Sequence, residues 1–286
     1  MNDILSEIID HKRTEIEMQK QAVSAQQLLE QINASGENNR PSPRRSMKQA
    51  LAASSTGIIA EFKRCSPSKG WIHEGADARH IPPAYREAGA AALSILTDEK
   101  YFGGSLRDIR TARPLVDIPI LRKDFIIDEY QLLQASIVGA DAILLIAACL
   151  TPERCAALTA QAHTLGLEVL LEVHSPSELT YINKDIDMVG VNNRNLGTFV
   201  TDVENSFRIA GQLRQTIAAL PTCPAVGSSD APLLVSESGI SHPETIRRLR
   251  SAGFRGFLIG ETFMKTGTPG KTLETFISQI RETDNR

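Results

Sequence analysis

The sequence lacks the features that would place it in a membrane, in a disulfide-rich class or on nucleic acid. Its longest apolar run, Ala142 to Leu150, is far shorter than the roughly 20 residues that a membrane helix needs. Its four cysteines form no Cys-x-x-Cys pair and are too few for a disulfide scaffold. With 31 Lys and Arg against 34 Asp and Glu, the net charge of −3 gives no general attraction to a polyanion. We therefore expect reduced thiols, no nucleic-acid partner and no membrane contact.

Metal and secretion signals are also missing. The six histidines show no His-x-x-x-His spacing, so we expect no metal site. Acidic residues stand near the N-terminus where a signal peptide carries basic ones, which predicts a cytoplasmic protein. What the chain does have is 286 residues with 42% hydrophobic content, enough for a large core.

The first 50 residues differ from the rest of the chain. Ile4, Ile8 and Ile16 lie at roughly helical spacing with Glu and Lys between them, which predicts an amphipathic helix. Residues 33–43 contain Gly, Asn and Pro and are expected to form a loop. We interpret residues 1–50 as an N-terminal helical extension and residues 51–286 as the main domain. The helix either covers the mouth of that domain or fills an apolar patch on it, and the sequence leaves both roles open.

Eight short apolar runs follow, with helical stretches between them. Such runs are nearly all apolar rather than alternating, which is typical of parallel strands covered on both faces. Helical periodicity occupies residues 129–138, 152–165 and 242–251, among others, and Gly139 and Gly253 stand where a helix should end. The runs span residues 57–61, 93–96, 118–121, 142–145, 168–171, 187–191, 233–236 and 256–259.

This repeat predicts an α/β fold, a closed (β/α)₈ TIM barrel in residues 51–286. The alternative is an open doubly wound sheet, but such a sheet normally carries Gly-x-Gly-x-x-Gly after its first strand, and none is present. Residues 221–230, which contain Pro, Gly and Ser, are expected to form a surface loop before the seventh strand.

Polar residues at the ends of the predicted strands are the candidates for an active site, because barrels of this class place it at the carboxyl ends of the strands. Together they supply carboxylates, ammonium groups and an amide, which suffice for general acid–base chemistry without a metal. The candidates are Glu61, Lys63, Lys123, Glu172, Asn192, Arg194, Glu237 and Ser238.

Small residues follow the last two strands, at Ser238, Gly239 and Gly260. Backbone N–H groups at this position form the usual phosphate site of such barrels. Ser66, in a Ser-Pro-Ser-Lys-Gly turn after the first strand, would add a hydroxyl donor. The pattern predicts a phosphorylated substrate. We expect Glu261, which follows the phosphate glycine, to point away from the anion.

Two strings are specific enough to identify a family: Ile59–Gly70 (IAEFKRCSPSKG) and Leu121–Ile126 (LRKDFI). Both closely resemble the indole-3-glycerol phosphate synthase family, and shorter strings at 171–173, 190–194, 236–240 and 258–260 follow in the family's order. The resemblance spans nearly the whole chain, including the N-terminal extension. It implies a cofactor-free carboxy-lyase of tryptophan biosynthesis. The reaction closes 1-(2-carboxyphenylamino)-1-deoxyribulose 5-phosphate to indole-3-glycerol phosphate, with loss of carbon dioxide and water.

The resemblance also implies roles for the site residues. Lys123 would be the general acid, and we expect burial to lower its pKa toward neutrality. Glu172, Glu61 and Lys63 are the candidates for the base and the second acid, and the sequence does not assign them to steps. Asn192 is counted with the catalytic residues and would orient the substrate together with Arg194. The remaining candidates would bind substrate: Glu237 and Ser238 would hold its hydroxyls, Ser66, Gly239 and Gly260 would hold its phosphate, and Phe125 and Leu196 would form apolar walls.

Two other functions stay open from the sequence. One is another metal-free phosphosugar barrel, such as phosphoribosylanthranilate isomerase, and the other is a non-catalytic barrel that binds a phosphosugar. Lys63 together with Lys123 favours the synthase, and the presence of Glu172 and Glu61 as well argues against a binding module. The expected partner is a small phosphorylated substrate. A monomer is the default state, and contact with other enzymes of the pathway is left open.

Overall fold

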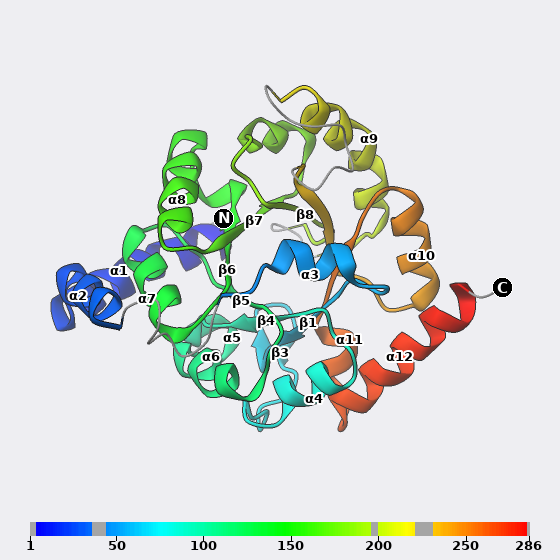
Figure 1. Cartoon of the computed structure of the whole chain (residues 1–286), viewed down its shortest axis with the longest axis horizontal. Coiled ribbons are helices and arrows are strands. Elements are labelled where there is room, and N and C mark those ends of the chain that lie inside the picture. The colour runs from blue at the N-terminus through cyan, green and yellow to red at the C-terminus, as the bar shows by residue number, and fades with distance from the viewer. Residues whose placement is uncertain (1–3, 36–43, 196–199, 221–230, 285–286) are drawn as a thin grey trace.

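Eight parallel strands close into a barrel in the order β1-β10-β9-β8-β7-β6-β5-β4, as the computed structural model shows (Figure 1). The structure describes residues 4–35, 44–195, 200–220 and 231–284. Each of the eight predicted apolar runs overlaps one strand, so the prediction of a (β/α)₈ barrel is confirmed. The strands are β1 (Ile58–Phe62), β4 (Ala92–Leu96), β5 (Ile120–Lys123), β6 (Ala142–Ile146), β7 (Glu168–Val173), β8 (Met188–Asn192), β9 (Leu233–Glu237) and β10 (Gly256–Ile259).

The strands are buried on both sides, which explains their continuous apolar sequences. Successive side chains point to opposite faces of a strand. In β1, Ile59 therefore joins the cluster inside the barrel, with Leu121, Leu170 and Leu258 among others. Its neighbour Ile58 joins the larger cluster between the strands and the surrounding helices.

Helices surround the barrel (Figure 1). The predicted helices at 129–138, 152–165 and 242–251 are confirmed to within one residue at each end. Gly139 ends α7 with a φ of 87°, a left-handed conformation that glycine adopts without strain. The outer helices are α4 (Ile81–Glu87), α6 (Leu106–Ala112), α7 (Glu129–Val138), α8 (Pro152–Thr164), α9 (Glu204–Ala218), α10 (Pro243–Ser251) and α12 (Pro269–Asp284).

Short elements lie in the loops at the carboxyl ends of the strands. A two-stranded hairpin, β2 (Cys65–Ser66) and β3 (Gly70–Trp71), follows β1. Helix α5 (Glu99–Phe102) follows β4, and α11 (Glu261–Met264) follows β10. Short 3₁₀ helices occupy 147–149, after β6, and 176–181, after β7, the latter called η4 (Pro176–Tyr181). A third, at 113–115, follows α6 and precedes β5. The expected surface loop at 221–230 lies outside the described residues.

The N-terminal extension contains two helices, α1 (Ile4–Ala22) and α2 (Ala25–Ser35). The predicted amphipathic helix is confirmed and continues to Ala22. The prediction of a loop at residues 33–43 is wrong for residues 33–35, which form the end of α2. Residues 36–43 lie outside the described part of the chain. Leu28 of α2 packs with Ile16 of α1 against Tyr130 and Leu133 of α7, and this packing extends the helix into turn-forming residues.

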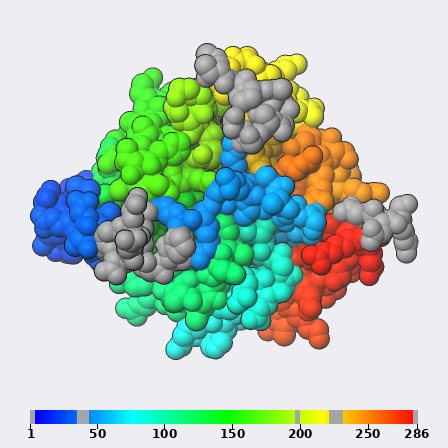
Figure 2. All heavy atoms as spheres, in the orientation of Figure 1, coloured from blue at the N-terminus to red at the C-terminus, as the bar shows by residue number. Residues whose placement is uncertain are grey.

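A third helix, α3 (Met47–Ala53), lies across the amino-terminal end of the barrel, where its segment covers the centre of the molecule in Figures 1 and 2. Met47 and Leu51 are fully buried in the cluster inside the barrel. The expected domain boundary at residue 50 falls within this helix. Because α3 closes this end, access to the barrel interior is left to the opposite end.

Among the described residues, no helix is both long and apolar enough to cross a membrane. Cys65, Cys149 and Cys155 are free thiols, and Cys155 is buried.

A buried lysine fixes α1 to the barrel. The side chain of Lys12 is 1% exposed, and its Nζ lies 2.9 Å from Asp98 Oδ2 and 3.1 Å from Asp124 Oδ1. Burial lowers the pKa of Lys12, but the charges of Asp124 and Asp98 outweigh it and raise the pKa above its usual value. Asp98 follows β4 and Asp124 follows β5, so α1 is held over the carboxyl ends of these strands.

Replacing Lys12 should therefore destabilise the fold. Lys12→Ala leaves Asp98 and Asp124 buried without this counterion, which typically costs about 3–5 kcal/mol. Urea denaturation should show this loss in the free energy of unfolding. As a control, Arg13→Ala removes an exposed pair with Asp10 and should cost less than about 1 kcal/mol. Equal, small losses in both variants would contradict the anchoring role of Lys12.

Candidate active site

A cavity of about 640 Å³ opens at the carboxyl ends of the strands. Every candidate residue within the described ranges lines it, although the candidates come from loops and strands throughout the barrel. Leu196 lies outside the described residues. The candidates on the wall are Glu61, Lys63, Ser66, Lys123, Phe125, Glu172, Asn192, Arg194, Glu237, Ser238, Gly239 and Gly260.

Two glycines give the buried carboxylates the space that they occupy. Gly190 of β8 lies beside Glu237, and a Cβ atom at position 190 would be 2.0 Å from Glu237 Oε1. Gly260, directly after β10, lies beside Glu61, and a Cβ there would be 2.3 Å from Glu61 Oε1. Any larger residue at either position would push a carboxylate out of place.

Lys123 lies among three buried glutamates. Its Nζ is 3.3 Å from Glu172 Oε2 and 3.9 Å from Glu237 Oε2, and its side chain is 16% exposed. Burial lowers the pKa of Lys123, but the charges of Glu172, Glu237 and Glu61 outweigh it and raise the pKa above the ordinary lysine value. The expectation that burial brings this pKa toward neutrality is therefore wrong, because the surrounding carboxylates favour the ammonium form.

The three glutamates are electrostatically unequal. Burial raises the pKa of each, but Lys63 and Lys123 lower that of Glu61, and Lys63 Nζ lies 2.6 Å from Glu61 Oε1. Lys123 and His174 hold the pKa of Glu172 well below its usual range. Glu237 is the exception: burial and the charge of Glu172 raise its pKa to about 8. Glu61 and Glu172 are thus ionised at neutral pH, while Glu237 holds a proton.

Arg194 links two loops at the cavity mouth. Its Nη1 donates a 2.7 Å hydrogen bond to Ser68 Oγ, and its Nη2 lies 3.6 Å from Glu261 Oε2. Lys69 Nζ is 3.9 Å from the other oxygen of Glu261. Glu261 lines the cavity, so the expectation that it points away is wrong. The two cations hold its carboxylate at the mouth.

The turn after β9 has an unusual backbone. Ser238 and Gly239 have φ values of 67° and 80°, and a serine rarely adopts this left-handed conformation. The side chain of Asn193 stabilises the turn, since its Nδ2 donates to Ser236 Oγ at 3.1 Å and to the Ser238 carbonyl at 3.0 Å. The turn brings Ser238 and Gly239 to the cavity wall. Gly260 also lines the cavity, at the end of the neighbouring strand β10.

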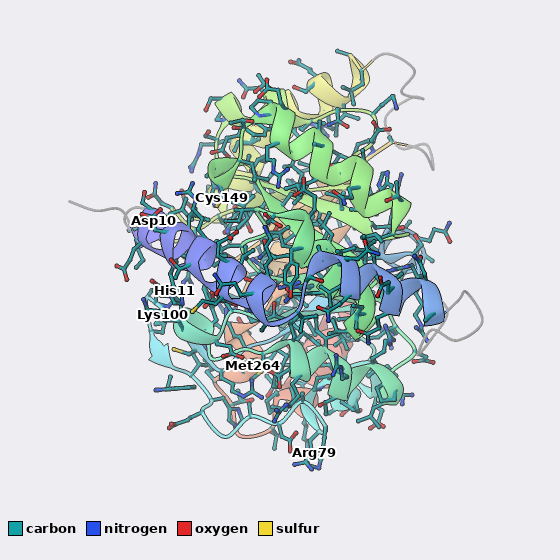
Figure 3. All side chains as sticks on the ribbon, turned by 90° about the vertical axis from the view of Figure 1, so that its left-hand side faces the viewer. Asp10, His11, Arg79, Lys100, Cys149 and Met264 are labelled. Carbon is teal, nitrogen blue, oxygen red and sulfur yellow. The ribbon has the colours of Figure 1, made fainter. Side chains whose placement is uncertain are left out.

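The N-terminal helix, for which the sequence left two roles open, forms part of the cavity wall. Ile4, Leu5 and Ile8 of α1 line the cavity, so the extension contributes directly to the site. Figure 3 shows α1 along this side of the barrel, with His11 beside Lys100 of α5. The His11 ring lies 5.9 Å from that of Tyr101, centroid to centroid. The apolar helical spacing of α1 was visible in the sequence, but its partner surface was not.

His174 was missed by the sequence interpretation. It stands two residues after Glu172, at the end of β7, where polar residues were the signal used for the other candidates. Its Nε2 lies 3.2 Å from Glu172 Oε1. Within the described ranges, no group of three or more His, Cys, Asp or Glu side chains is arranged to hold a metal ion.

Comparison with known proteins identifies the family. The family model for indole-3-glycerol phosphate synthase matches residues 5–276. The chain belongs to this family. A synthase from Bacteroides thetaiotaomicron is 66% identical over 281 residues, covering 98% of this chain and 100% of the relative. A synthase from Syntrophobacter fumaroxidans is 39% identical over 277 residues, covering 96% of this chain and 97% of the relative. The chain is thus a carboxy-lyase of tryptophan biosynthesis that acts on a small phosphorylated substrate.

Solved structures share the fold at low identity. The tryptophan synthase α subunit from Legionella pneumophila is 15% identical, with a TM-score of 0.58, over 84% of this chain and 98% of its own. A thiamine phosphate pyrophosphorylase from Pyrococcus furiosus is 16% identical, with a TM-score of 0.54, over 83% of this chain and 98% of its own. Both similarities concern the barrel alone.

The glycine beside Glu61 yields a test of the synthase cavity. In Gly260→Ala the new Cβ would meet Glu61 Oε1 and also lie 3.0 Å from its Cβ and Cδ, so rotation of the carboxylate alone does not relieve the clash. Displacement of Glu61 breaks its pair with Lys63, and we expect kcat/KM to fall roughly 10- to 100-fold, as misplacement by about 1 Å can do.

Gly211→Ala is the matched control, because a Cβ at position 211 would meet no atom within 4 Å. Its kcat/KM should equal that of the unmodified enzyme. A Gly260→Ala variant with unchanged kcat/KM would show that the position of Glu61 does not matter to the reaction.

Proposed function

We propose that Lys123 is the general acid and Glu172 the general base of the synthase reaction in this chain. The observation that supports both roles is the ammonium of Lys123, 3.3 Å from the ionised carboxylate of Glu172, on the wall of one cavity. An acid and a base side by side can serve two steps at neighbouring atoms of one substrate.

In the first step, the ring carbon that carries the carboxylate forms a bond to the carbonyl carbon of the sugar chain. The carbonyl oxygen becomes strongly basic as this bond forms, and it takes a proton from Lys123. The raised pKa keeps Lys123 charged before the step, so the proton is present whenever substrate binds. The bond to the carboxylate then breaks, carbon dioxide leaves, and its electron pair restores the aromatic ring.

In the second stage, the new hydroxyl leaves as water and the five-membered ring becomes aromatic. The hydroxyl takes a second proton, and a proton leaves the carbon beside the former carbonyl. Glu172 accepts that proton, and Lys63, paired with Glu61 at 2.6 Å, donates the other. Two protons are delivered and one is removed, so each turnover takes up one proton from solvent.

The remaining residues position the substrate. Ser66, Gly239 and Gly260 bind the phosphate, while Asn192 and Arg194 orient the chain between the phosphate and the ring. Ser238 and the protonated Glu237 hold its hydroxyls. Phe125 packs against the aromatic ring, together with the apolar face of α1 that lines the cavity. Holding the two reacting ends together is worth several kcal/mol, as in other reactions within one molecule.

The acid is tested by removing its proton. Lys123→Ala should lower kcat by at least about 100-fold, as loss of a general acid typically does, with a smaller change in KM. Purified protein is incubated with 1-(2-carboxyphenylamino)-1-deoxyribulose 5-phosphate in buffer without added metal, and indole fluorescence follows the product.

Lys271→Ala, on the exposed face of α12, is the control and should keep full activity. If Lys123→Ala turns over substrate at nearly the normal rate, the acid is another residue. If the unmodified protein gives no indole fluorescence, the proposed function itself is wrong.

A further inference from the structure

His174 is clamped between two carboxylates behind the active site. Its side chain is 12% exposed, its Nε2 lies 3.2 Å from Glu172 Oε1, and its Nδ1 lies 3.6 Å from Glu178 Oε2. Glu178, in η4, also accepts a 2.6 Å hydrogen bond from the backbone N–H of His174. On the other side, Asn205 of α9 donates to the carbonyl of His174 at 3.2 Å. The backbone of His174 is therefore fixed by hydrogen bonds. Its ring is held between the two carboxylates by charge, since within the described residues neither ring nitrogen has a well-aligned hydrogen-bond partner.

Because of His174, Glu172 and Glu237 have different numbers of cations near their carboxylates. Glu172 has a cation on each oxygen, Lys123 on Oε2 at 3.3 Å and His174 on Oε1 at 3.2 Å. The cation nearest to Glu237 is Lys123, at 3.9 Å. Both carboxyls are buried and lie within 4 Å of the Lys123 ammonium, and Glu61 is a third buried acid in the same cavity. Two buried acids that share one lysine do not ionise equally. The proton stays on the acid whose carboxylate has fewer cations near it.

We propose that His174, held by Glu178, is a positioning residue that keeps Glu172 as the ionised member of the Glu172–Glu237 pair. The proposal rests on the role of Glu172 as the base. An ionised Glu172 is free to accept the proton that leaves the substrate. Its neutral neighbour Glu237 then has an O–H group to donate to a substrate hydroxyl.

The charges around His174 support its cationic form. Burial lowers the pKa of His174, but Glu172 and Glu178 outweigh it and raise the pKa to about 10. The other charged groups that line the hollow beside the ring are Arg194, Asp202 and Arg208. Arg208 and Asp202 pair with each other at 2.9 Å, so they offset one another. At neutral pH the imidazolium is therefore a permanent charge beside Glu172.

The test is the pH dependence of kcat/KM in His174→Asn. Without the cation, the proton of the pair moves toward Glu172, whose apparent pKa rises. Activity that needs ionised Glu172 is lost as pH falls through that pKa, so the acid limb of the profile should move up by at least about one pH unit. Relative to the unmodified enzyme, kcat/KM of His174→Asn should fall about tenfold more at the acid end of the profile than at the alkaline end. Because the two groups are coupled, the measured value belongs to the pair.

A matched control comes from the other end of the same strand. His163 pairs with Asp187 at 2.9 Å, and Asp187 accepts from the N–H of Val169 at the start of β7. His163→Asn removes the same chemical group far from the cavity and should leave the profile unchanged. A His174→Asn variant that loses the same factor at every pH has only a structural defect, and this result would overturn the proposal.

The clamp itself is tested with Glu178→Gln. This variant should shift the acid limb in the same direction by a smaller amount, and it should add nothing in the double variant with His174→Asn, because Glu178 acts through the histidine. Independent, additive shifts in the double variant would overturn the clamp. The single variant Glu178→Gln can be measured even if His174→Asn folds poorly, and an unshifted acid limb in it would also overturn the clamp.

Glu172→Gln separates this proposal from the one on which it rests. It should abolish turnover at every pH. If Glu172→Gln remains active, the base has been assigned wrongly. If Glu172→Gln is inactive while the His174→Asn profile matches the unmodified enzyme, the role of His174 alone is wrong.

Discussion

The ammonium of Lys123 lies inside a ring of three buried glutamates, and the arrangement of the active site depends on the charge balance between them. A buried carboxylate is costly unless cations or hydrogen bonds compensate it. Here Lys63 compensates Glu61, and Lys123 and His174 compensate Glu172. Glu237 has the weakest compensation and takes a proton instead. A site of this kind holds charged and neutral forms of acidic groups side by side before substrate arrives.

The barrel supports this balance in two ways. Gly190 and Gly260 leave the space that Glu237 and Glu61 need, so the strands themselves are shaped around the carboxylates. The end of β5 is held by a second charge cluster directly beside Lys123. There Asp124 accepts from Arg122 at 2.9 Å and pairs with Lys12 at 3.1 Å. Through Lys12 the N-terminal helix is tied to the residue that follows Lys123, while Ile8 and its neighbours close part of the cavity.

Much of the fold was predictable because it follows from local pattern. Parallel strands covered on both faces must be apolar throughout, and this marked all eight strands and hence the residues at their carboxyl ends. Helix α2 was partly missed, because its last turn contains Asn and Ser and is held by packing on α7 that the sequence does not display. His174 stands at a strand end like the other candidates. Nothing in the sequence, however, shows that its ring lies between the carboxylates of Glu172 and Glu178.

The errors in the site concern electrostatics. Burial of Lys123 was foreseen, but the sign of its pKa shift depends on how many carboxylates surround the ammonium and how closely, which is a property of the closed barrel. Glu261 was expected to avoid the anion site, whereas Arg194 and Lys69, from two other loops, hold it at the mouth. Residue types at strand ends thus predict which groups meet, but the protonation state of each depends on the distances between them.

The most direct test of this account is the titration of Lys123 itself. Protein labelled with ¹⁵N at the lysine side chains, with the signal assigned through Lys123→Arg, reports the charge of Nζ by NMR as pH is raised. Lys123 should still be an ammonium above about pH 10.4, the ordinary lysine value. A signal that changes to the neutral amine near pH 7 would contradict it, since burial would then outweigh the three glutamates.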